Sequence, residues 1–551
     1  MQLAHLRSIR IVVTLVFFVA LLFLFLGIDI RGFNTLSDLL LRLQFFPSVL
    51  RFMALFFSLS ALGFLLMIVL SMLFGRIYCS SVCPLGTFQD MVIALARRLK
   101  PKQKRRFYFN PGRKRILRYG VLSATILFWI SGSLFLVNLL DPFSNFGKLS
   151  VALFQPAYIW LHNVLAFSLE KFDVFLLVPK TMHALPLNVV MISVVIFLTI
   201  VVMAAWRGRL FCNTICPAGS VLGIFASRPL FRISFNDEAC TFCKRCEWVC
   251  KAECLDSQNK IVDHSRCINC FNCFASCPNN GIHYALQPAV VRKKPNDSTH
   301  KNKRQFLLHF TAGLLSLPFL NKYANAQGVL QQEERQQQER QQQGRQQQGR
   351  QRMRQARQPG MIPIGEKKAV TPPGSLGHDH FTSHCIACYL CVSACPTKVI
   401  VPAFYAYGLE GFMQPTLDFH RNYCNYDCVR CTRVCPTGAI TRQTEESKRL
   451  IRIGEVRFLV ESCIVMVDRT DCGACSEHCP TKAVQMVPWR GGLFIPEIHP
   501  ELCVGCGACE YACPTEPYKA IYVTGLPVHT KAAAIDDLQG PREDEPDDFP
   551  F

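Results

Sequence analysis

The residues with the clearest capacity for chemistry are the 29 cysteines of this 551-residue chain. Most of them fall into groups spaced Cys-x2-Cys-x2-Cys-x3-Cys, or close to it. In such a group three thiolates in one loop hold an iron–sulfur cubane, and the fourth reaches across to a neighbouring cluster. So many cysteines are unusual for a cytosolic enzyme, and they are not distributed as in a small disulfide-bonded domain. The pattern indicates one-electron chemistry on [4Fe–4S] clusters.

The first two groups lie between residues 240 and 277 and predict two clusters. Because the fourth thiolate crosses over, the expected ligand sets are Cys240, Cys243, Cys246 and Cys277 for one cluster and Cys267, Cys270, Cys273 and Cys250 for the other. Cys250 is followed by Lys251 instead of proline, and an extra thiol, Cys254, lies four residues on. Cys254 is either a substitute fourth ligand or, the interpretation we favour, a buried unligated thiol. Two complete repeats of the spacing disfavour zinc or disulfides.

Four more groups follow at near-equal intervals and predict four more clusters, about six in all. The sixteen expected ligands are Cys385, Cys388, Cys391, Cys395, Cys424, Cys428, Cys431, Cys435, Cys463, Cys472, Cys475, Cys479, Cys503, Cys506, Cys509 and Cys513. The second and third of these groups have wider first gaps, so their loops must bulge. Two exchanges of fourth ligands fit the spacing: adjacent groups pair (one with two, three with four), or the pairs are nested (one with four, two with three).

Two shorter motifs read Cys-x-x-x-Cys-Pro, each with a glycine two residues beyond the proline. One contains Cys79 and Cys83, and the other contains Cys212 and Cys216. If either segment is helical, the spacing of four residues places its two sulfurs on one face. The two pairs are candidates for a four-thiolate metal site or for redox-active dithiols, and the alternative is packing at helix ends. Repetition at equivalent depth favours a functional role.

The elements that must position these cysteines include membrane spans. Half of the residues are hydrophobic, only 18% are charged, and the mean hydropathy is +0.20. Four apolar runs, Ile11–Ile28, Phe52–Phe74, Tyr119–Leu140 and Leu187–Ala205, approach the roughly 20 residues that cross a bilayer. A fifth stretch, Ser150–Ser168, is interrupted by polar residues and proline, and we interpret it as interfacial or re-entrant.

Basic residues predict the orientation of these spans, because Lys and Arg concentrate in cytoplasmic loops. Arg7 and Arg10 precede the first run, Arg207 and Arg209 follow the fourth, and Arg97–Arg118 holds eleven basic residues and no acid. All three places are expected in the cytoplasm, and so is the first cluster module. The formal net charge of +21 does not indicate nucleic-acid binding, because no binding motif accompanies it.

A further apolar stretch, 306–320, follows the basic residues around Lys303 and ends before Ala324-Asn-Ala326. Its basic start, short apolar middle and small-x-small end are typical of a secretory signal. It is similar to a twin-arginine signal with Lys303 in the place of the first arginine, and a fifth membrane segment or a buried helix is the alternative. Export would place the second cluster module in the periplasm. The Gln/Arg-rich stretch that follows buries too little apolar surface to fold.

The expected fold class is a multi-domain membrane protein with an N-terminal transmembrane helical domain and α+β modules of the bacterial ferredoxin type. The predicted divisions are 1–230 for the membrane domain, 231–295 for the first module, 300–326 for the signal-like or fifth membrane segment, 327–380 for the linker, 381–530 for the four-cluster module and 531–551 for an acidic tail.

The paired Cys-x-x-x-Cys-Pro motifs, the four spans and the first ferredoxin repeat together resemble the NapH-type membrane ferredoxins, a group that includes NosR and MauN. This resemblance covers roughly residues 1 to 290. The second half, about residues 300 to 530, resembles the NapG and MauM ferredoxin-type proteins. The resemblance implies an inner-membrane protein that oxidises quinol and delivers electrons to a periplasmic reductase, with nitrate reductase as the family-based partner.

Other features narrow the range of functions. The sequence contains no Cys-x-x-Cys-His motif for covalent haem, no histidine in the four predicted spans, and no P-loop, hydrolase triad or molybdopterin-binding domain. We therefore expect an electron-transfer component, in contact with membrane lipid, quinol and a reductase or cytochrome partner. The competing hypothesis is an accessory or redox-sensing scaffold for maturation of a periplasmic metalloenzyme. No cofactor is evident in the sequence across the roughly 30 Å bilayer core between the modules.

Overall fold

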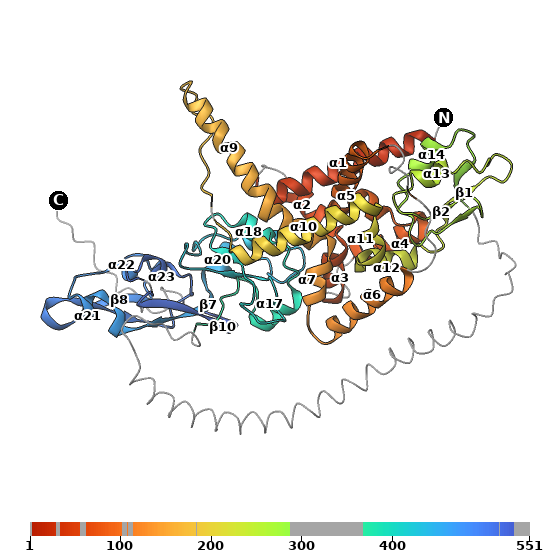
Figure 1. Ribbon diagram of the computed structural model, residues 1–551. Helices are drawn as coiled ribbons and strands as arrows, with labels where there is room; N and C mark the ends of the chain where they lie inside the picture. The colour runs from red at the N-terminus through yellow and green to blue at the C-terminus, as the bar shows by residue number, and fades with distance from the viewer. Residues whose placement is uncertain are drawn as a thin grey trace, which may run out of the picture. The chain divides into compact units, whose positions relative to one another are not determined.

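The computed structural model describes residues 3–28, 34–54, 62–101, 107, 114–182, 184–286, 367–516 and 518–533, all of which belong to one compact unit (Figure 1). The signal-like segment and the first part of the predicted linker, residues 300–366, lie outside the described residues. So does the tail from residue 534.

The N-terminal part of the chain is helical. Its elements are α1 (Leu3–Leu26), α2 (Asn34–Arg42), α3 (Phe45–Ala54), α4 (Leu62–Phe74), η2 (Tyr78–Val82), α5 (Pro84–Leu99), α6 (Lys114–Ile130), α7 (Phe135–Leu140), α8 (Pro142–Leu149), η4 (Ser150–Phe154), α9 (Gln155–Glu170), α10 (Leu187–Arg207), α11 (Leu210–Thr214) and α12 (Pro217–Phe225). Two of them, over His5–Leu26 and Leu187–Arg207, are long and apolar enough to cross a bilayer. They correspond to the first and fourth predicted spans.

The third predicted span is not observed as a single long helix. The second overlaps the end of α3 and contains α4, and residues 55–61 between them are outside the described part. The third divides into α6 and α7 at Ser131-Gly-Ser133, where Gly132 has a φ of +86°. A left-handed residue ends an α-helix, so the chain turns before α7 begins. The prediction of one span over Tyr119–Leu140 is therefore wrong in its geometry.

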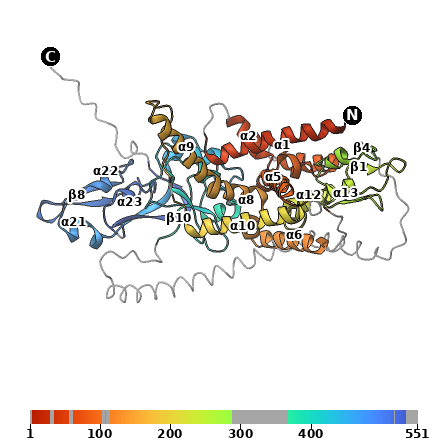
Figure 2. The ribbon, with the colours of Figure 1, turned by 45° about the horizontal axis from the view of Figure 1, so that its top comes forward.

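The predicted interfacial stretch is helical along its whole length. The helices α8, η4 and α9 follow one another without a break from Pro142 to Glu170, with a π-helical segment at Ser150–Phe154. Pro156 does not interrupt the helix, because it directly follows the π-helical segment, where the regular pattern of backbone hydrogen bonds is already altered. Half of the residues of α9 are exposed, including Trp160 and Phe167, and the helix extends away from the helices around it in Figures 1 and 2.

The first module consists of short antiparallel strand pairs joined by cysteine-containing loops. Strand β1 (Phe231–Phe235) pairs with β4 (Ile282–Leu286), and β2 (Leu255–Asp256) pairs with β3 (Ile261–Val262). The one-turn helices α13 (Arg245–Trp248) and α14 (Asn272–Ser276) each follow a cysteine loop. This is an α+β arrangement, as the sequence predicts.

The second module repeats this plan. Its strands are β5 (Ile400–Pro402), β6 (Pro415–Leu417), β7 (Ile451–Phe458), β8 (Val484–Pro488), β9 (Phe494–Ile498) and β10 (Ile521–Lys531), and they pair β5–β6, β7–β10 and β8–β9, all antiparallel. Its helices are α17 (His378–His384), α18 (Leu390–Ala394), α19 (Arg430–Val434), α20 (Glu445–Arg449), η5 (Val460–Ser462), α21 (Ile464–Val467), α22 (Ala474–Glu477), η6 (Arg490–Gly492) and α23 (Ala508–Ala512).

The C-terminal end of the predicted linker belongs to this module. Val370 and Ser375 are buried, the N–H of Leu417 donates to the carbonyl of Val370, and Gly377 forms a bridge with Val528. The linker boundary at residue 380 is therefore wrong, because an extended segment and α17 precede the first cysteine and cover the module.

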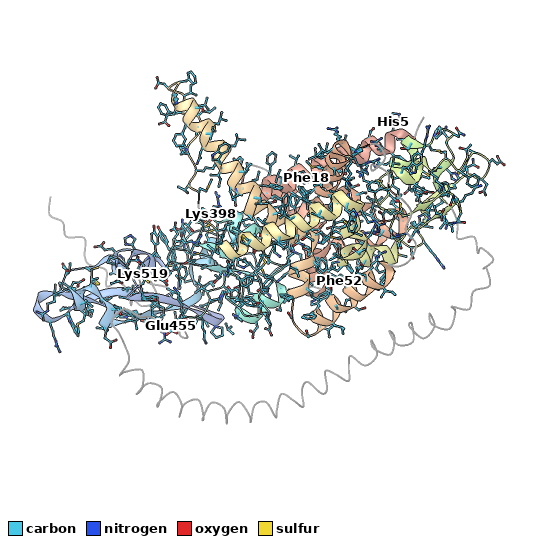
Figure 3. All side chains as sticks on the ribbon, in the orientation of Figure 1. His5, Phe18, Phe52, Lys398, Glu455 and Lys519 are labelled. Carbon is cyan, nitrogen blue, oxygen red and sulfur yellow. The ribbon has the colours of Figure 1, made fainter. Side chains whose placement is uncertain are left out.

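Helix α1 connects the first cysteine motif with the second module. At its middle, the Thr14 hydroxyl donates to the carbonyl of Ser80 at 2.9 Å. Beyond its end, Gly27 lies against the second module, and a Cβ there would be 2.9 Å from the carbonyl oxygen of Ser393. In between, Phe18 packs on Phe146 of α8 with ring centroids 5.5 Å apart (Figure 3). At 1.5 Å per residue, α1 therefore bridges about 20 Å from Thr14 to Gly27.

Candidate iron–sulfur centres

The structure brings the eight expected ligands of the first module into two sets. One small cavity is lined by Cys240, Cys243, Cys246 and Cys277. A second is lined by Cys250, Cys254, Cys267, Cys270 and Cys273. The fourth cysteine of each group thus lies with the first three of the other group, which is the crossed arrangement that the spacing predicts.

Cys254 lies inside the second of these cavities. Its sulfur is 3.5 Å from that of Cys250 and also interacts with Cys267. The Cys254 thiol lowers the pKa of Cys250, so the Cys250 thiolate is the better ligand at neutral pH. Cys254 is buried, with 1% of its surface exposed, and it lines the same cavity as the four expected ligands.

In the second module the cysteines group by adjacent pairs. Cys479 lines one cavity with Cys503, Cys506 and Cys509. Its exchange partner, Cys513, interacts electrostatically with Cys463 and Cys475, which also interact with Cys472. Likewise Cys435 faces Cys385, Cys388 and Cys391, while Cys395 faces Cys424, Cys428 and Cys431. The nested exchange does not fit this geometry.

The four regular loops share one backbone conformation. In each, the residues directly before and after the middle cysteine have positive φ: Phe242 and Lys244, Asn269 and Phe271, Ala387 and Tyr389, and Gly505 and Gly507. Six of these eight are not glycine, so the left-handed conformation is strained. The backbone adopts this conformation because it must direct the sulfurs of three successive cysteines toward one cluster. The two loops with widened gaps lack this pattern among their described residues.

In each of the four cysteine groups of the second module, the last cysteine is followed by Pro-Thr. This regularity is present in the sequence, and the structure shows its consequence. The four threonine hydroxyls, Thr397, Thr437, Thr481 and Thr515, lie 3.5, 3.7, 3.7 and 2.9 Å from the sulfur of the cysteine two residues earlier. Hydrogen bonds to cluster sulfurs are among the determinants of reduction potential.

Burial sets the protonation of these thiols before any cluster is inserted. Burial, together with the charges of neighbouring thiols, raises the pKa of Cys388 and of Cys506 to about 12. Neutral thiols at physiological pH are therefore expected in the metal-free module, and cluster insertion must release protons.

The two Cys-x-x-x-Cys-Pro motifs meet at one site in the helical part. Cys79, Cys83, Cys212 and Cys216 are each 3–4% exposed, and their thiols interact electrostatically. Cys79 lies in η2, Cys212 lies in α11, and the second cysteine of each motif caps the next helix. Within the described residues, no three His, Cys, Asp or Glu side chains converge on a point that one metal ion would occupy. Tight convergence is what a mononuclear zinc site requires.

Two buried arginines link the motifs. Arg76 donates to the carbonyl of Cys212 at 3.1 Å and to the sulfur of Cys79 at 3.5 Å. Arg209 donates to the carbonyl of Cys79 at 2.9 Å and lies 3.9 Å from the sulfur of Cys212. Each arginine therefore reaches from its own motif to the other one, so the site has an approximate twofold pattern. Both side chains are fully buried.

The glycine of each motif makes room for the opposite arginine. A Cβ on Gly86 would lie 2.5 Å from the carbonyl oxygen of Cys79 and 2.7 Å from the Arg209 guanidinium. A Cβ on Gly219 would lie 2.3 Å from the carbonyl oxygen of Cys212 and 2.6 Å from the Arg76 guanidinium. The functional repeat is thus Gly-Arg-x-x-Cys-x3-Cys-Pro-x-Gly, longer than the motif identified from the sequence. The sequence indicates Arg209 only as a marker of orientation, and its burial shows that it also belongs to this site.

The two buried arginines differ in their charged partners. Asp90 accepts from Arg209 at 2.9 Å and lies 3.2 Å from Lys251 and 3.4 Å from Arg10. Arg76 instead contacts the Asn213 side chain at 2.7 Å, backbone carbonyls and a sulfur. Among the described residues, no carboxylate forms an ion pair with Arg76. A buried cation without a counter-ion is unfavourable, so the site suits an anionic group.

The four-cysteine site also joins the two modules. The N–H of Arg209 donates to the carbonyl of Lys251 at 2.9 Å, and Asn213 donates to that of Ala252 at 3.2 Å, both in the first module. One apolar core contains the four cysteines together with Cys388 of the second module, and Cys270 of the first module packs against it.

Comparisons with known proteins agree with this description. Residues 55–103 and 189–235 match a family described as a 4Fe-4S binding domain, and the cysteines in these ranges are those of the two Cys-x-x-x-Cys-Pro motifs. Residues 384–439 and 468–516 match a 4Fe-4S dicluster domain. No solved structure matches the chain.

Three relatives illustrate the similarity. The ferredoxin-type protein NapF of Escherichia coli K12 is 28% identical over 136 residues, 25% of this chain and 74% of NapF. The methylamine utilization ferredoxin-type protein MauM of Methylorubrum extorquens is 34% identical over 148 residues, 25% of this chain and 66% of MauM. YccM of E. coli K12 is 25% identical over 228 residues, 41% of this chain and 56% of YccM. The chain therefore contains ferredoxin-type 4Fe–4S domains and is related to NapF and MauM.

Proposed function

We propose that this chain is an inner-membrane iron–sulfur electron conduit that accepts electrons from quinol and passes them to a periplasmic reductase. The observation that carries the proposal is the site at Cys79, Cys83, Cys212 and Cys216, which lies in one apolar core with Cys388 and against Cys270. A redox group at that site would connect the two modules.

The six ferredoxin clusters are assigned to the cysteine sets described above. When bound, each [4Fe–4S] cluster exchanges one electron. The chain's own contribution is to hold the thiolates in strained loops, to donate threonine hydroxyls toward the crossed sulfurs, and to exclude water from the cages.

We further propose that the four-cysteine site, formed by Cys79, Cys83, Cys212 and Cys216, holds an additional iron–sulfur cluster. Four thiolates bring excess negative charge, and Arg76 and Arg209 are buried beside them. Among the described residues, Asp90 is the one carboxylate that pairs with either arginine. Buried charges require opposite charge nearby. Protonated packing cysteines would leave Arg76 uncompensated, whereas a thiolate-ligated cluster neutralises it.

The membrane assignment rests on the two long apolar helices, α1 and α10, and on the basic residues that flank them. On this basis we propose that the first module lies in the cytoplasm and the second in the periplasm. The arrangement of α1 supports this placement, because Thr14 contacts the first cysteine motif and Gly27 contacts the second module.

Anaerobic proteoliposomes containing the full-length chain test the proposal. We expect menaquinol to bleach the iron–sulfur absorbance, and iron and sulfide content to exceed that of six cubanes. In the double variant Cys79→Ser/Cys212→Ser, we expect only one module to be reduced by quinol, while dithionite reduces both.

Two outcomes would overturn the proposal. If no quinol reduces any cluster while dithionite reduces all of them, quinol is not the donor. If the reduction potentials of the clusters lie far below those of quinols, quinol cannot reduce them. That result would favour the alternative, a redox-sensing or maturation scaffold.

A further inference from the structure

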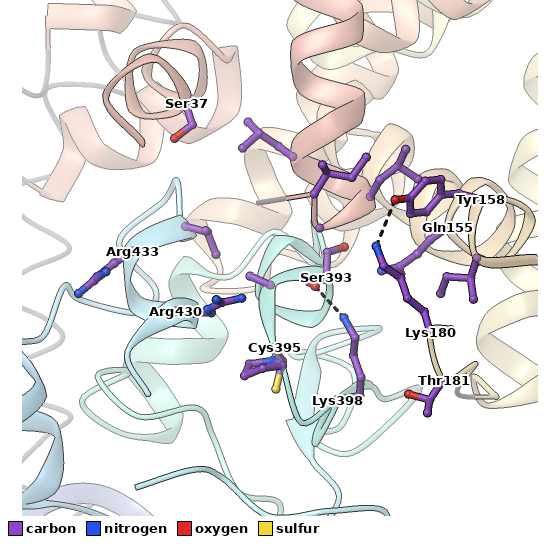
Figure 4. A pocket seen from close by; sticks show the side chains of 18 of the residues that line it. Ser37, Gln155, Tyr158, Lys180, Thr181, Ser393, Cys395, Lys398, Arg430 and Arg433 are labelled. Carbon is purple, nitrogen blue, oxygen red and sulfur yellow. Dashed lines mark hydrogen bonds between the residues drawn. The ribbon is translucent and has the colours of Figure 1, made fainter. Parts of the chain in front are cut away.

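A cavity of about 560 Å³ lies where the helical part meets the second module. Its walls come from the end of α1, the first turns of α9, the segment 179–181, and the loop and helices around Cys395. Figure 4 shows Tyr158 and Lys180 on one side and Cys395 and Lys398 on the other. The cavity adjoins one of the iron–sulfur sites described above, because Cys395 lines it.

One wall of the cavity is apolar. Leu24, Leu26 and Ile28 come from the end of α1, and Ile159 comes from α9. The adjacent face of α9 exposes Trp160 and Leu161 at 62% and 61%. An apolar wall that continues into exposed apolar helices admits a ligand from the lipid phase.

The opposite wall is polar and basic. The Lys180 ammonium donates to the Tyr158 hydroxyl at 3.1 Å, and the Lys398 ammonium donates to the carbonyl of Ser393 at 2.8 Å. Arg430 and Arg433 also line the cavity, and Arg433 pairs with Glu445 at 3.9 Å. None of the lining residues is acidic. The polar wall therefore favours a ligand that hydrogen-bonds and becomes anionic.

The polar wall also includes Cys395. This cysteine faces Cys424, Cys428 and Cys431 and is assigned with them to one cluster. A ligand in the cavity would thus contact a residue that holds a redox centre, which a site for structural lipid does not require.

We propose that this cavity is the quinol oxidation site, with the quinol ring between Tyr158 and Cys395 and the isoprenoid tail along α1 and α9. The inference deepens the proposed function and depends on it. Oxidation of one quinol breaks two O–H bonds, yields one quinone and releases two protons to water. Its two electrons would leave one at a time to the [4Fe–4S] cluster assigned to Cys395, which accepts one electron and would pass it to the neighbouring cluster assigned to Cys435 before it accepts the second. Nearby cations favour the deprotonated quinol, which is the form that gives up an electron more easily.

Binding and reduction are measured separately in the full-length protein. The site variants are Lys180→Met and Tyr158→Phe, and the matched control is Lys171→Met, at the exposed end of α9 and outside the cavity. A photoreactive azido-quinone is expected to label the wild type and the control in residues 155–181, and to label the site variants weakly. Loss of a hydrogen bond to a charged group predicts a fall of about tenfold in the rate of cluster reduction by menaquinol.

The outcomes separate this inference from the proposed function. Failure of menaquinol to reduce the wild type overturns the proposed function. Wild-type reduction with unchanged rates and labelling in both site variants overturns the cavity assignment alone. Loss of co-purified anionic lipid from the variants with an unchanged quinol rate also overturns it, and would identify a lipid site. EPR spectra after dithionite confirm that the variants retain their clusters.

Discussion

The guanidinium of Arg209 donates a 2.9 Å hydrogen bond to the backbone carbonyl of Cys79, which lies 130 residues earlier in the chain. Arg76 makes the reciprocal bond to Cys212. This exchange holds two short cysteine motifs from distant segments against each other. It also places two permanent positive charges next to four thiols, so the same residues assemble the site and set its electrostatics.

The arginines are expected to raise the reduction potential of a cluster at this site. Replacing Arg76 with Gln removes a buried cation and stabilises the oxidised, less negative state. A loss of about 1.4 kcal/mol corresponds to a shift of about 60 mV for one electron, so the potential should fall by at least that amount. EPR-monitored redox titration measures it. Arg207→Gln is the control, because Arg207 is partly exposed and pairs with Glu253 at 3.6 Å. Equal potentials in the two variants would contradict the electrostatic role.

The glycines of the motifs should not tolerate a side chain. Gly219→Ala places a Cβ 2.3 Å from a backbone oxygen, and overpacking of this kind costs about 1–3 kcal/mol. We expect a lower unfolding temperature and loss of iron and sulfide equivalent to one cluster. Gly120→Ala in α6 is the control, because its Cβ would meet no atom within 4 Å. Normal iron content in Gly219→Ala would show that the close approach is not needed.

Adjacent exchange in the second module predicts which substitutions act on the same cluster. Cys479→Ser and Cys503→Ser should remove the same EPR signal, because both cysteines line one cavity. Cys513→Ser should remove a different signal, together with Cys475→Ser. If Cys479→Ser instead matches Cys424→Ser, the exchange is nested and the observed grouping is wrong.

Cys254 is expected to act as a reserve ligand. Its sulfur is 3.5 Å from that of Cys250 in the same cavity. Cys254→Ser should keep the full iron content, Cys250→Ser should keep part of the cluster through Cys254, and the double variant should lose it. Iron analysis and EPR distinguish these cases, with Cys273→Ser as the reference for complete loss. A loss in Cys254→Ser alone would make Cys254 the native fourth ligand.

The amino-acid sequence determined the local chemistry of this protein. Three cysteines separated by two residues, as in Cys385, Cys388 and Cys391, bring three sulfurs into one loop wherever that loop lies. The ferredoxin-type modules could therefore be predicted from spacing alone, and the family matches at 384–439 and 468–516 confirm 4Fe–4S domains in this half. The hydropathy pattern likewise predicted α1 and α10, because their apolar runs are continuous and long.

Tertiary structure decided every relationship between distant residues. Spacing left the partners of Cys479 open, because equal intervals fit two exchanges, and packing of the strands and loops selected one. In the sequence Arg209 resembled an ordinary flanking charge and Arg76 was not singled out, since a linear pattern does not show which basic residues become buried. The cavity beside Cys395 combines segments more than 200 residues apart in the sequence, so no local pattern contains it. The physical reason is common to all three: cysteine loops form from neighbours in the chain, whereas charge burial, ligand exchange and cavities depend on which surfaces pack together.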